Sequence, residues 1–295
     1  MIPQSIANWM RAIRIRFLLA SVIAVSNGVA IAFWKTGAIT FSYGILTLAG
    51  VICLHISVDL LNDYWDYKRG IDKITKRTKF SGGTGVLTDN ILNPRVVYGV
   101  GILFLVLGTL IGTFFVVIRG ITIAVILVFA VFAIYFYSTN IVNAGLSELF
   151  VAIKGLMIVL GSYYVQTGLI NPTALFVGII IGILSASVLF VNSFPDYEAD
   201  RYGRRRTLVI LLGQQNAVKA VPLFLITPYI LILVGILFGY TKIVSLITFA
   251  SIPFLVKAIN NLNKYNEIDK FVSVMAATVM FARITGLLFA LSFLL

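Results

Sequence analysis

Aspartates are concentrated in residues 59–72, which read DLLNDYWDYKRGID and follow an apolar run. On an α-helix, Asp59, Asp63 and Asp66 have the i, i+4, i+7 spacing that places them on one face, and Asn62 lies at the edge of that face. An ionised side chain inside a membrane span costs about 3 kcal/mol, and clustered carboxylates repel unless a cation or proton neutralises them. The cluster therefore favours a cation site; the alternative is a helix end whose acids only face solvent.

A second acidic stretch, residues 192–206, reads NSFPDYEADRYGRRR. Both stretches contain an asparagine, three further residues, an aspartate and a tyrosine; in the second stretch these are Asn192, Asp196 and Tyr197. Asp200 lies one helical turn beyond Asp196, so these two carboxylates also share a face. Because the chain contains only 11 acidic residues, the recurrence indicates a weak internal repeat and favours the cation site.

The segments that must position these side chains are typical of a membrane protein. The 295 residues are 60% hydrophobic and 12% charged, with a mean hydropathy of +1.01, which is too apolar for a soluble domain of this size. We predict an all-α, polytopic membrane protein in which about nine transmembrane helices surround a central cavity, with residues 1–295 forming one domain. The expected helices lie near 14–34, 38–62, 94–118, 120–138, 145–167, 172–193, 213–238, 242–259 and 270–294.

Basic residues predict how these helices are oriented. If successive helices alternate in direction, both acidic stretches emerge on the side of the N-terminus, together with most lysines and arginines. Only Lys35, Arg119 and Lys242 fall on the other side. The positive-inside rule then places the N-terminus and both acidic stretches in the cytoplasm of a multi-pass cell-membrane protein. Lipid headgroups and phosphate substrates explain the net charge of +12 better than nucleic acid does.

Two carboxylate clusters at one end of a helical bundle suit the chemistry of a diphosphate. A diphosphate is anionic, so carboxylates can bind it only through bridging cations, and Mg²⁺ accepts one or two carboxylates while retaining several waters. The bridging ion also stabilises a departing diphosphate. Since an apolar bundle suits an isoprenoid tail, we predict that an allylic prenyl diphosphate loses its diphosphate inside a membrane cavity.

These motifs resemble those of a known family. Residues 62–72 and the sequence DYEAD at 196–200, followed by an arginine-rich turn, resemble the two motifs of the UbiA family of intramembrane prenyltransferases. The sequences KRGID after the first motif, FSGGTGVL at 80–87, GLSE at 145–148 and GSYYVQTG at 161–168 resemble the MenA branch, whose enzymes prenylate 1,4-dihydroxy-2-naphthoate in menaquinone biosynthesis. The chain also resembles the branch that prenylates geranylgeranylglyceryl phosphate in archaeal ether lipid synthesis.

The resemblance implies a prenyltransferase that moves a geranylgeranyl or longer group from an isoprenyl diphosphate to a small aromatic acceptor, releases diphosphate and uses Mg²⁺. It implies the following metal-binding residues: Asn62, Asp63, Asp66, Asp72, Asn192, Asp196 and Asp200. A cation-coupled membrane transporter is the alternative from another class, but it predicts acids spread through the depth of the membrane. A phosphoalcohol transferase of the CDP-alcohol type is disfavoured because its ordered aspartate signature is missing from the sequence.

Further candidates follow from the placement of cations and aromatic rings. Lys154 lies about ten residues into an apolar helix, where an ammonium needs an anion; we expect diphosphate, with snorkelling or a structural ion pair as alternatives. The expected diphosphate-binding residues are Arg16, Lys68, Arg69, Lys154, Arg204 and Arg205. Tyr135 and Tyr137, in the sequence YFYS, offer an aromatic face for a developing cation, or else belong to the interfacial belt. The expected catalytic residues are Asn62, Asp66, Asp196, Asp200, Tyr135 and Lys154.

Three remaining features are weaker signals. His55 is the only histidine, and without a second histidine or a cysteine partner we expect it to pack or form a hydrogen bond rather than bind metal. The pair Gly82–Gly83 is either a simple turn or a hinge that closes a loop over the site and excludes water. Arg283 lies in the middle of the last helix, and the sequence shows no evident partner for it.

Overall fold

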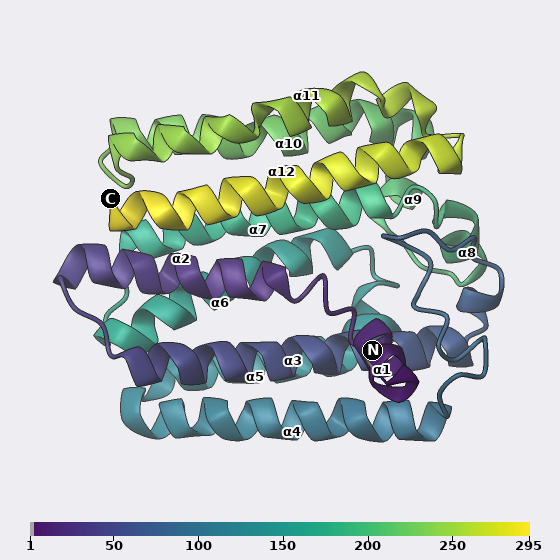
Figure 1. Ribbon diagram of the computed structural model, residues 1–295, viewed down its shortest axis with the longest axis horizontal. Helices are drawn as coiled ribbons and strands as arrows, with labels where there is room; N and C mark the ends of the chain where they lie inside the picture. The colour runs from purple at the N-terminus through teal and green to yellow at the C-terminus, as the bar shows by residue number, and fades with distance from the viewer. Residues whose placement is uncertain (1–2) are drawn as a thin grey trace.

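The computed structural model describes residues 3–295, which fold into α-helices with short 3₁₀ and π segments and contain no strand (Figure 1). Within this range, nine helical segments are long and apolar enough to cross a membrane. They are α2 (Leu19–Thr36), α3 (Phe41–Lys68), α4 (Pro94–Arg119), α5 (Ile121–Phe136) with a π-helix (Tyr137–Ile141), α6 (Ser147–Thr167), α7 (Pro172–Asn192), α10 (Gln214–Leu237), a 3₁₀ helix (Ile243–Ser251) with α11 (Ile252–Asn260), and α12 (Ile268–Leu294). The shorter elements are α1 (Gln4–Ala12), α8 (Tyr197–Tyr202), α9 (Leu208–Leu212) and 3₁₀ turns at Ile71–Lys73 and Leu262–Lys264. The prediction of an all-α, polytopic fold is confirmed.

The predicted helix edges differ from the observed ones mainly in the first two spans. The first span begins at Leu19 rather than near residue 14, because Arg14 has a left-handed backbone (φ 47°) that separates α1 from α2. The second span continues as helix to Lys68 instead of ending near residue 62. All the aspartates from Asp59 to Asp66 therefore lie on regular helix, as their spacing predicted.

Local sequence explains where several helices begin and end. The side chains of Asn93 and Asn171 accept hydrogen bonds from the backbone amides two residues later, and each precedes a proline at the first helical position. Gly37 and Gly168 end α2 and α6 in the left-handed conformation, which costs glycine little. The Asn-Pro joins in the sequence are thus helix starts.

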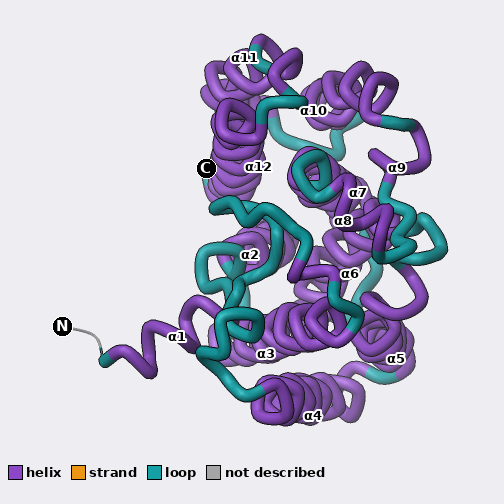
Figure 2. The backbone as a smooth tube through the Cα atoms, turned by 90° about the vertical axis from the view of Figure 1, so that its right-hand side faces the viewer, coloured by secondary structure: helices purple, strands orange, loops and turns teal. Residues whose placement is uncertain are grey.

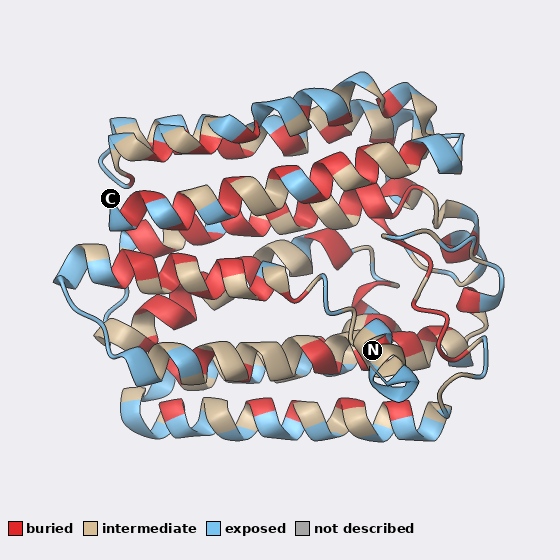
Figure 3. Cartoon of the chain, in the orientation of Figure 1, coloured by how far each residue is buried: buried red, intermediate tan, exposed pale blue. Residues whose placement is uncertain are grey.

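Figure 2 views most of the long helices end-on, with α4 and α5 at one edge of the bundle and α10 and α11 at the other. The largest core cluster draws its buried side chains mainly from α2, α6, α7, α10 and α12, including Phe190, Phe281 and Phe289. Helices α6 and α7 approach so closely that a Cβ on Gly155 would lie 2.7 Å from Cα of Gly182, the small-residue packing that membrane helices favour. Figure 3 shows buried residues concentrated on the inner helices, while α4, α10 and α11 present exposed apolar side chains on their outer faces.

Candidate active site

The two acidic stretches meet at one end of the bundle, the end that carries α8 and α9 in Figure 1. They lie at a cavity of about 450 Å³ that is bounded by α2 to α7 and α12. Asp66 and Asp196 both line this cavity, although 130 residues separate them in the chain. Most of the other lining side chains are apolar. The structure therefore brings the predicted acidic residues to one end of a largely apolar chamber.

Arg205 joins the two acidic stretches directly. Its Nη2 donates a short hydrogen bond to Oδ1 of Asp66, and its Nη1 donates to Oδ1 of Asp200 at 3.3 Å. The three side chains are largely buried, with 13% of Arg205, 6% of Asp66 and 5% of Asp200 exposed. A single guanidinium thus spans one carboxylate from each motif, which shows how close the motifs lie in space.

The asparagines of the two motifs have different surroundings. Nδ2 of Asn62 donates to Oδ2 of Asp66 at 3.0 Å, and its Oδ1 accepts from the hydroxyl of Ser138 at 2.8 Å. Asn62 therefore orients Asp66 and has both ends of its amide occupied. In contrast, Oδ1 of Asn192 and Oδ1 of Asp196 are buried and form no hydrogen bond, so they are free to bind a ligand.

These donors fit a magnesium ion that is shared with a phosphate. Within residues 3–295, no three His, Cys, Asp or Glu side chains lie close enough to hold a metal ion by themselves. Mg²⁺, however, binds through one or two carboxylates together with substrate phosphates and waters. The unpaired oxygens of Asn192 and Asp196 are of the type that Mg²⁺ prefers, so the residues fit an ion that a phosphate completes.

The loop after the first motif closes one side of the site. Asp72 lies in the 3₁₀ turn after α3, lines the cavity and is buried. Gly82 and Gly83 both have left-handed backbones and line the cavity. A Cβ on Gly83 would lie 2.7 Å from Oδ1 of Asp72. Gly83 therefore packs the loop directly against Asp72.

Burial sets the protonation of the acids at this end. Burial, with smaller contributions from the charges of Asp66 and Asp63, raises the pKa of Asp72 to about 8. Burial and the charge of Asp200 likewise raise the pKa of Asp196 to about 8. Burial raises the pKa of Asp200 to about 6, with the charge of Arg205 acting in the opposite direction. A divalent cation would therefore displace protons when it binds here.

Asp63, predicted as a metal ligand, lies outside the cavity lining and has other partners. Nη2 of Arg14 donates to its Oδ1 at 2.5 Å, and the hydroxyl of Thr84 donates a short hydrogen bond to its Oδ2. Nε of Arg11 donates to the carbonyl oxygen of Thr84 at 2.6 Å. Asp63 thus connects α3 to two other segments: to the loop after the first motif through Thr84, and to the segment before α2 through Arg14. Arg14, which the sequence did not single out, lines the cavity beside it.

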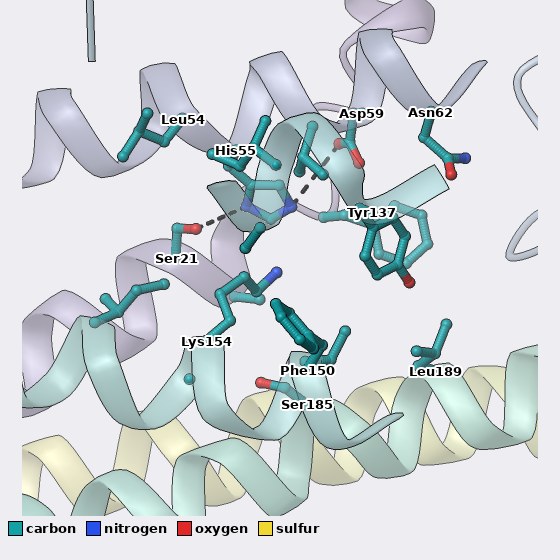
Figure 4. Close-up of a pocket in the computed structure, with 18 of the residues that line it drawn as sticks. Ser21, Leu54, His55, Asp59, Asn62, Tyr137, Phe150, Lys154, Ser185 and Leu189 are labelled. Atoms are coloured by element: carbon teal, nitrogen blue, oxygen red, sulfur yellow. Dashed lines mark hydrogen bonds and ion pairs between the residues drawn. The ribbon is translucent and has the colours of Figure 1, made fainter. Parts of the chain in front are cut away.

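Of the two tyrosines in YFYS, Tyr137 lines the cavity, whereas Tyr135, the one expected to be catalytic, does not. Tyr135 is 43% exposed, packs edge-on against Phe136 and lies outside the cavity lining. Tyr137 begins the π-helix at the end of α5 and lines the cavity, as Figure 4 shows. Residues two apart on a helix lie about 200° apart, so Tyr135 and Tyr137 face opposite directions. Clustered aromatic residues in YFYS marked this segment but could not distinguish its two tyrosines.

Four of the predicted diphosphate-binding cations lie outside the cavity lining. The exposed Arg16 accepts a hydrogen bond at its carbonyl oxygen from Arg283, and Arg204 is exposed with a left-handed backbone. Nζ of Lys68 lies 5.1 Å from the centre of the Trp65 ring. Arg69 donates to the carbonyl oxygens of Ser138 and Gly203 and to Asn143, and so joins three segments of the protein. Arg205 is the arginine of the predicted set that reaches both motifs.

A separate polar group lies deeper in the cavity (Figure 4). Nδ1 of His55 is 2.7 Å from the hydroxyl of Ser21, and its Nε2 is 3.8 Å from Oδ2 of Asp59. Lys154, from α6, points into the same part of the cavity. The structure thus places Lys154 beside His55 and Asp59 rather than beside Arg205. The expectation that His55 forms a hydrogen bond is confirmed.

Known proteins show the same sequence pattern and architecture. The chain is 26% identical over 248 residues to the 1,4-dihydroxy-2-naphthoate octaprenyltransferase of Bacillus subtilis (strain 168), covering 82% of this chain and 78% of that protein. It is 25% identical over 300 residues to the protein of the same name from Escherichia coli (strain K12), covering 97% and 95%. The structure of a UbiA homolog from Archaeoglobus fulgidus bound to GPP and Mg²⁺ shares the fold, with a TM-score of 0.63 at 13% identity over 96% of this chain and 99% of that chain.

The match to a protein family extends over almost the whole chain. Residues 21–293 match the model of the UbiA prenyltransferase family. This range contains both acidic motifs and the nine membrane-crossing segments of the described residues, apart from the first two positions of α2 and the last position of α12. This chain therefore belongs to the UbiA prenyltransferase family and is a multi-pass membrane prenyltransferase.

Proposed function

We propose that this prenyltransferase uses Mg²⁺ to transfer a geranylgeranyl or longer group from its allylic diphosphate to 1,4-dihydroxy-2-naphthoate, releasing diphosphate. The observation that carries the proposal is Arg205, which joins Asp66 and Asp200 at the end of an apolar cavity. Relatives named for 1,4-dihydroxy-2-naphthoate support this acceptor. We propose that residues 1–295 act as a single domain.

The acidic residues have distinct proposed roles. Asp66, Asp196, Asp200 and Asn192 would hold Mg²⁺, which when bound supplies positive charge that stabilises the departing diphosphate. Asn62 acts by orienting Asp66 through their hydrogen bond. Asp72 supports the site from the loop, where it contacts the position of Gly83.

Two of the arginines that line the cavity would bind the diphosphate itself. Arg205 and Arg14 both line the cavity, and each has a buried Nε that forms no hydrogen bond. A guanidinium presents several donors in a plane and suits phosphate oxygens. These two residues therefore take the role that the sequence assigned to a larger set of cations.

The rest of the cavity would control the carbocation. When the bond between C1 of the tail and the diphosphate oxygen breaks, its electron pair leaves with the diphosphate and positive charge develops on C1. The ring of Tyr137 can stabilise that charge, while the apolar walls exclude the water that would consume it. A ring carbon of the acceptor then supplies an electron pair for the new carbon–carbon bond. The ring becomes aromatic again when that carbon loses its proton, or loses its carboxylate as CO₂.

The distribution of charge supports a cytoplasmic site. Lys35, Arg119 and Lys242 lie at the end of the bundle opposite to the acidic motifs, the end where the C-terminus is seen in Figure 1. Most other cations lie at the motif end. By the positive-inside rule, we propose that the N-terminus and the active site face the cytoplasm of the cell membrane.

The decisive experiment compares acidic variants in a direct product assay. Purified protein in detergent receives geranylgeranyl diphosphate, Mg²⁺ and one of three acceptors: 1,4-dihydroxy-2-naphthoate, 4-hydroxybenzoate or geranylgeranylglyceryl phosphate. Mass spectrometry identifies the product, and released diphosphate is measured in parallel. Asp66→Ala and Asp196→Ala should both abolish product, whereas the matched control Asp269→Ala changes an exposed acid outside the cavity lining and should not.

Each result of this assay decides between named functions. Near-normal turnover by both acidic variants would reject the proposed metal site. A product formed only with geranylgeranylglyceryl phosphate would assign the protein to ether lipid synthesis instead. Substrate-coupled flux across liposomes without release of diphosphate would identify a transporter.

A further inference from the structure

The polar group deep in the cavity is not used by the diphosphate chemistry. His55 and Asp59 lie one turn apart on α3, and Lys154 extends towards them from α6 (Figure 4). Asp59 precedes Asp66 by seven residues, or about 10 Å along the helix axis. A diphosphate held through Mg²⁺ at Asp66 and Asp200 is therefore centred about two helical turns from this group, which leaves Lys154 for a different ligand.

Lys154 is the residue of this group that most needs a partner. In the described chain, residues 3–295, its ammonium forms no hydrogen bond and no ion pair, whereas His55 contacts both Ser21 and Asp59. It lies about two turns into a membrane-crossing helix. A cation at such a depth is costly unless an anion approaches it. The ammonium points into the cavity, so an anion delivered by a ligand can reach it.

Aromatic side chains stand next to this cation. Phe150, one helical turn before Lys154, and Tyr137 both line the cavity and lie between Lys154 and the end that carries Asn62 (Figure 4). Flat rings stack favourably on such faces. A planar ligand in this space would have its ring against the aromatic side chains and an anionic substituent at the ammonium.

We propose that Lys154 binds the carboxylate of an aromatic acid acceptor, whose ring lies against Phe150 and Tyr137. This inference rests on the proposed function and names the group of the acceptor that the protein recognises. It replaces the sequence-based assignment of Lys154 to the diphosphate. The two substrates then have separate cations, with Arg205 for the diphosphate and Lys154 for the acceptor.

The test is a binding experiment with two ligands that differ only in a carboxylate. 1-Hydroxy-2-naphthoate and 1-naphthol are titrated into purified full-length protein in nanodiscs, and heats of binding are measured for the wild type and Lys154→Met. We expect Lys154→Met to weaken binding of the acid by about 10- to 100-fold, as for the loss of a hydrogen bond to a charged group, and to leave 1-naphthol unchanged. Lys154→Arg should restore much of the affinity.

Two controls separate this role from a general effect on the protein. Lys35→Met also removes one lysine charge, but in the last turn of α2 and outside the cavity lining. This variant should bind both ligands like the wild type. Inorganic diphosphate with Mg²⁺ should bind Lys154→Met normally, because its site lies at Arg205. Lys154→Gln serves in place of Lys154→Met if the latter does not fold in a thermal unfolding measurement.

The outcomes distinguish this inference from the proposed function. Equal weakening of both naphthalene ligands, no preference of the wild type for the acid, or a loss confined to diphosphate would each overturn the role of Lys154. If the acid binds through Lys154 but no acceptor is prenylated, the proposed function fails and the inference stands. If transfer proceeds normally in Lys154→Met with 1,4-dihydroxy-2-naphthoate at low concentration, the inference fails and the proposed function stands.

Discussion

Substituting Gly83 by alanine tests whether the loop and Asp72 belong to the active site. Gly83 has φ +70°, and an added Cβ would lie 2.7 Å from Oδ1 of Asp72, where ordinary contact begins at 3.4 Å. The carboxylate or the loop must therefore move by about 0.7 Å, a shift derived from these two distances. The left-handed backbone adds a strain of about 1–2 kcal/mol for a residue with a side chain. Because a displacement of about 1 Å can cost 100-fold in rate, we expect kcat/KM for prenyl transfer to fall by about 10- to 100-fold.

Gly37→Ala is the matched control for backbone strain. Gly37 has nearly the same φ, +72°, but nothing lies within 4 Å of its added Cβ, and it ends α2 on the far side of the bundle. Thermal unfolding should show the cost of backbone strain in both variants, with a further loss of stability in Gly83→Ala from the contact with Asp72. The product assay should show a loss of transfer in Gly83→Ala alone. Equal transfer rates in the two variants would refute the reasoning, since the contact with Asp72 would then have no catalytic consequence.

Three other predictions concern the same end of the cavity. Arg205→Met should lower the free energy of unfolding by about 3 kcal/mol, because it leaves buried carboxylates unpaired. The same variant should abolish binding of Mg²⁺ with diphosphate in calorimetry. Arg204→Met, at an exposed position, should do neither. Tyr137→Leu should reduce kcat by about tenfold through loss of the aromatic face, and equal rates for Tyr137→Leu and Tyr135→Leu would contradict this role. The pKa of Asp196 is about 8 in the folded protein against 3.8 in a free side chain, so Mg²⁺ affinity should rise with pH up to about 8. Without metal, at pH values between 3.8 and about 8, Asp196 is protonated in the folded protein but ionised in the unfolded protein. The free energy of unfolding should therefore fall as pH rises through that window. Thermal melts in buffers of different pH can check this.

The fold follows closely from the sequence because long apolar segments leave few alternatives. A membrane span must satisfy its backbone hydrogen bonds internally, so an apolar run of sufficient length predicts a helix. Alternation of these helices was then enough to place Asp66 and Asp196 at the same end. The structure adds α1, which lies outside the spans and whose weakly apolar residues give no hydropathy signal.

The candidate site was predicted less completely because several roles depend on partners remote in sequence. Asp63 has the same helical spacing as its neighbours, yet Arg14 and Thr84 occupy both of its oxygens. Arg205 and Arg204 are adjacent and chemically identical, and only the turn after α8 decides which of them points inward. Spacing identifies which residues can share a helix face, but it does not reveal what packs against that face.

The π turn at Tyr137–Ile141 imposes a strict requirement on the length of the fifth helical segment. One residue corresponds to about 100° of rotation on an α-helix, so deleting a single residue there would restore ordinary winding and turn Tyr137 away from the cavity. The same rotation would withdraw the hydroxyl of Ser138 from Asn62 and so release the amide that orients Asp66. The surplus residue therefore links the aromatic wall to the acidic motif, and neither can be repositioned without disturbing the other.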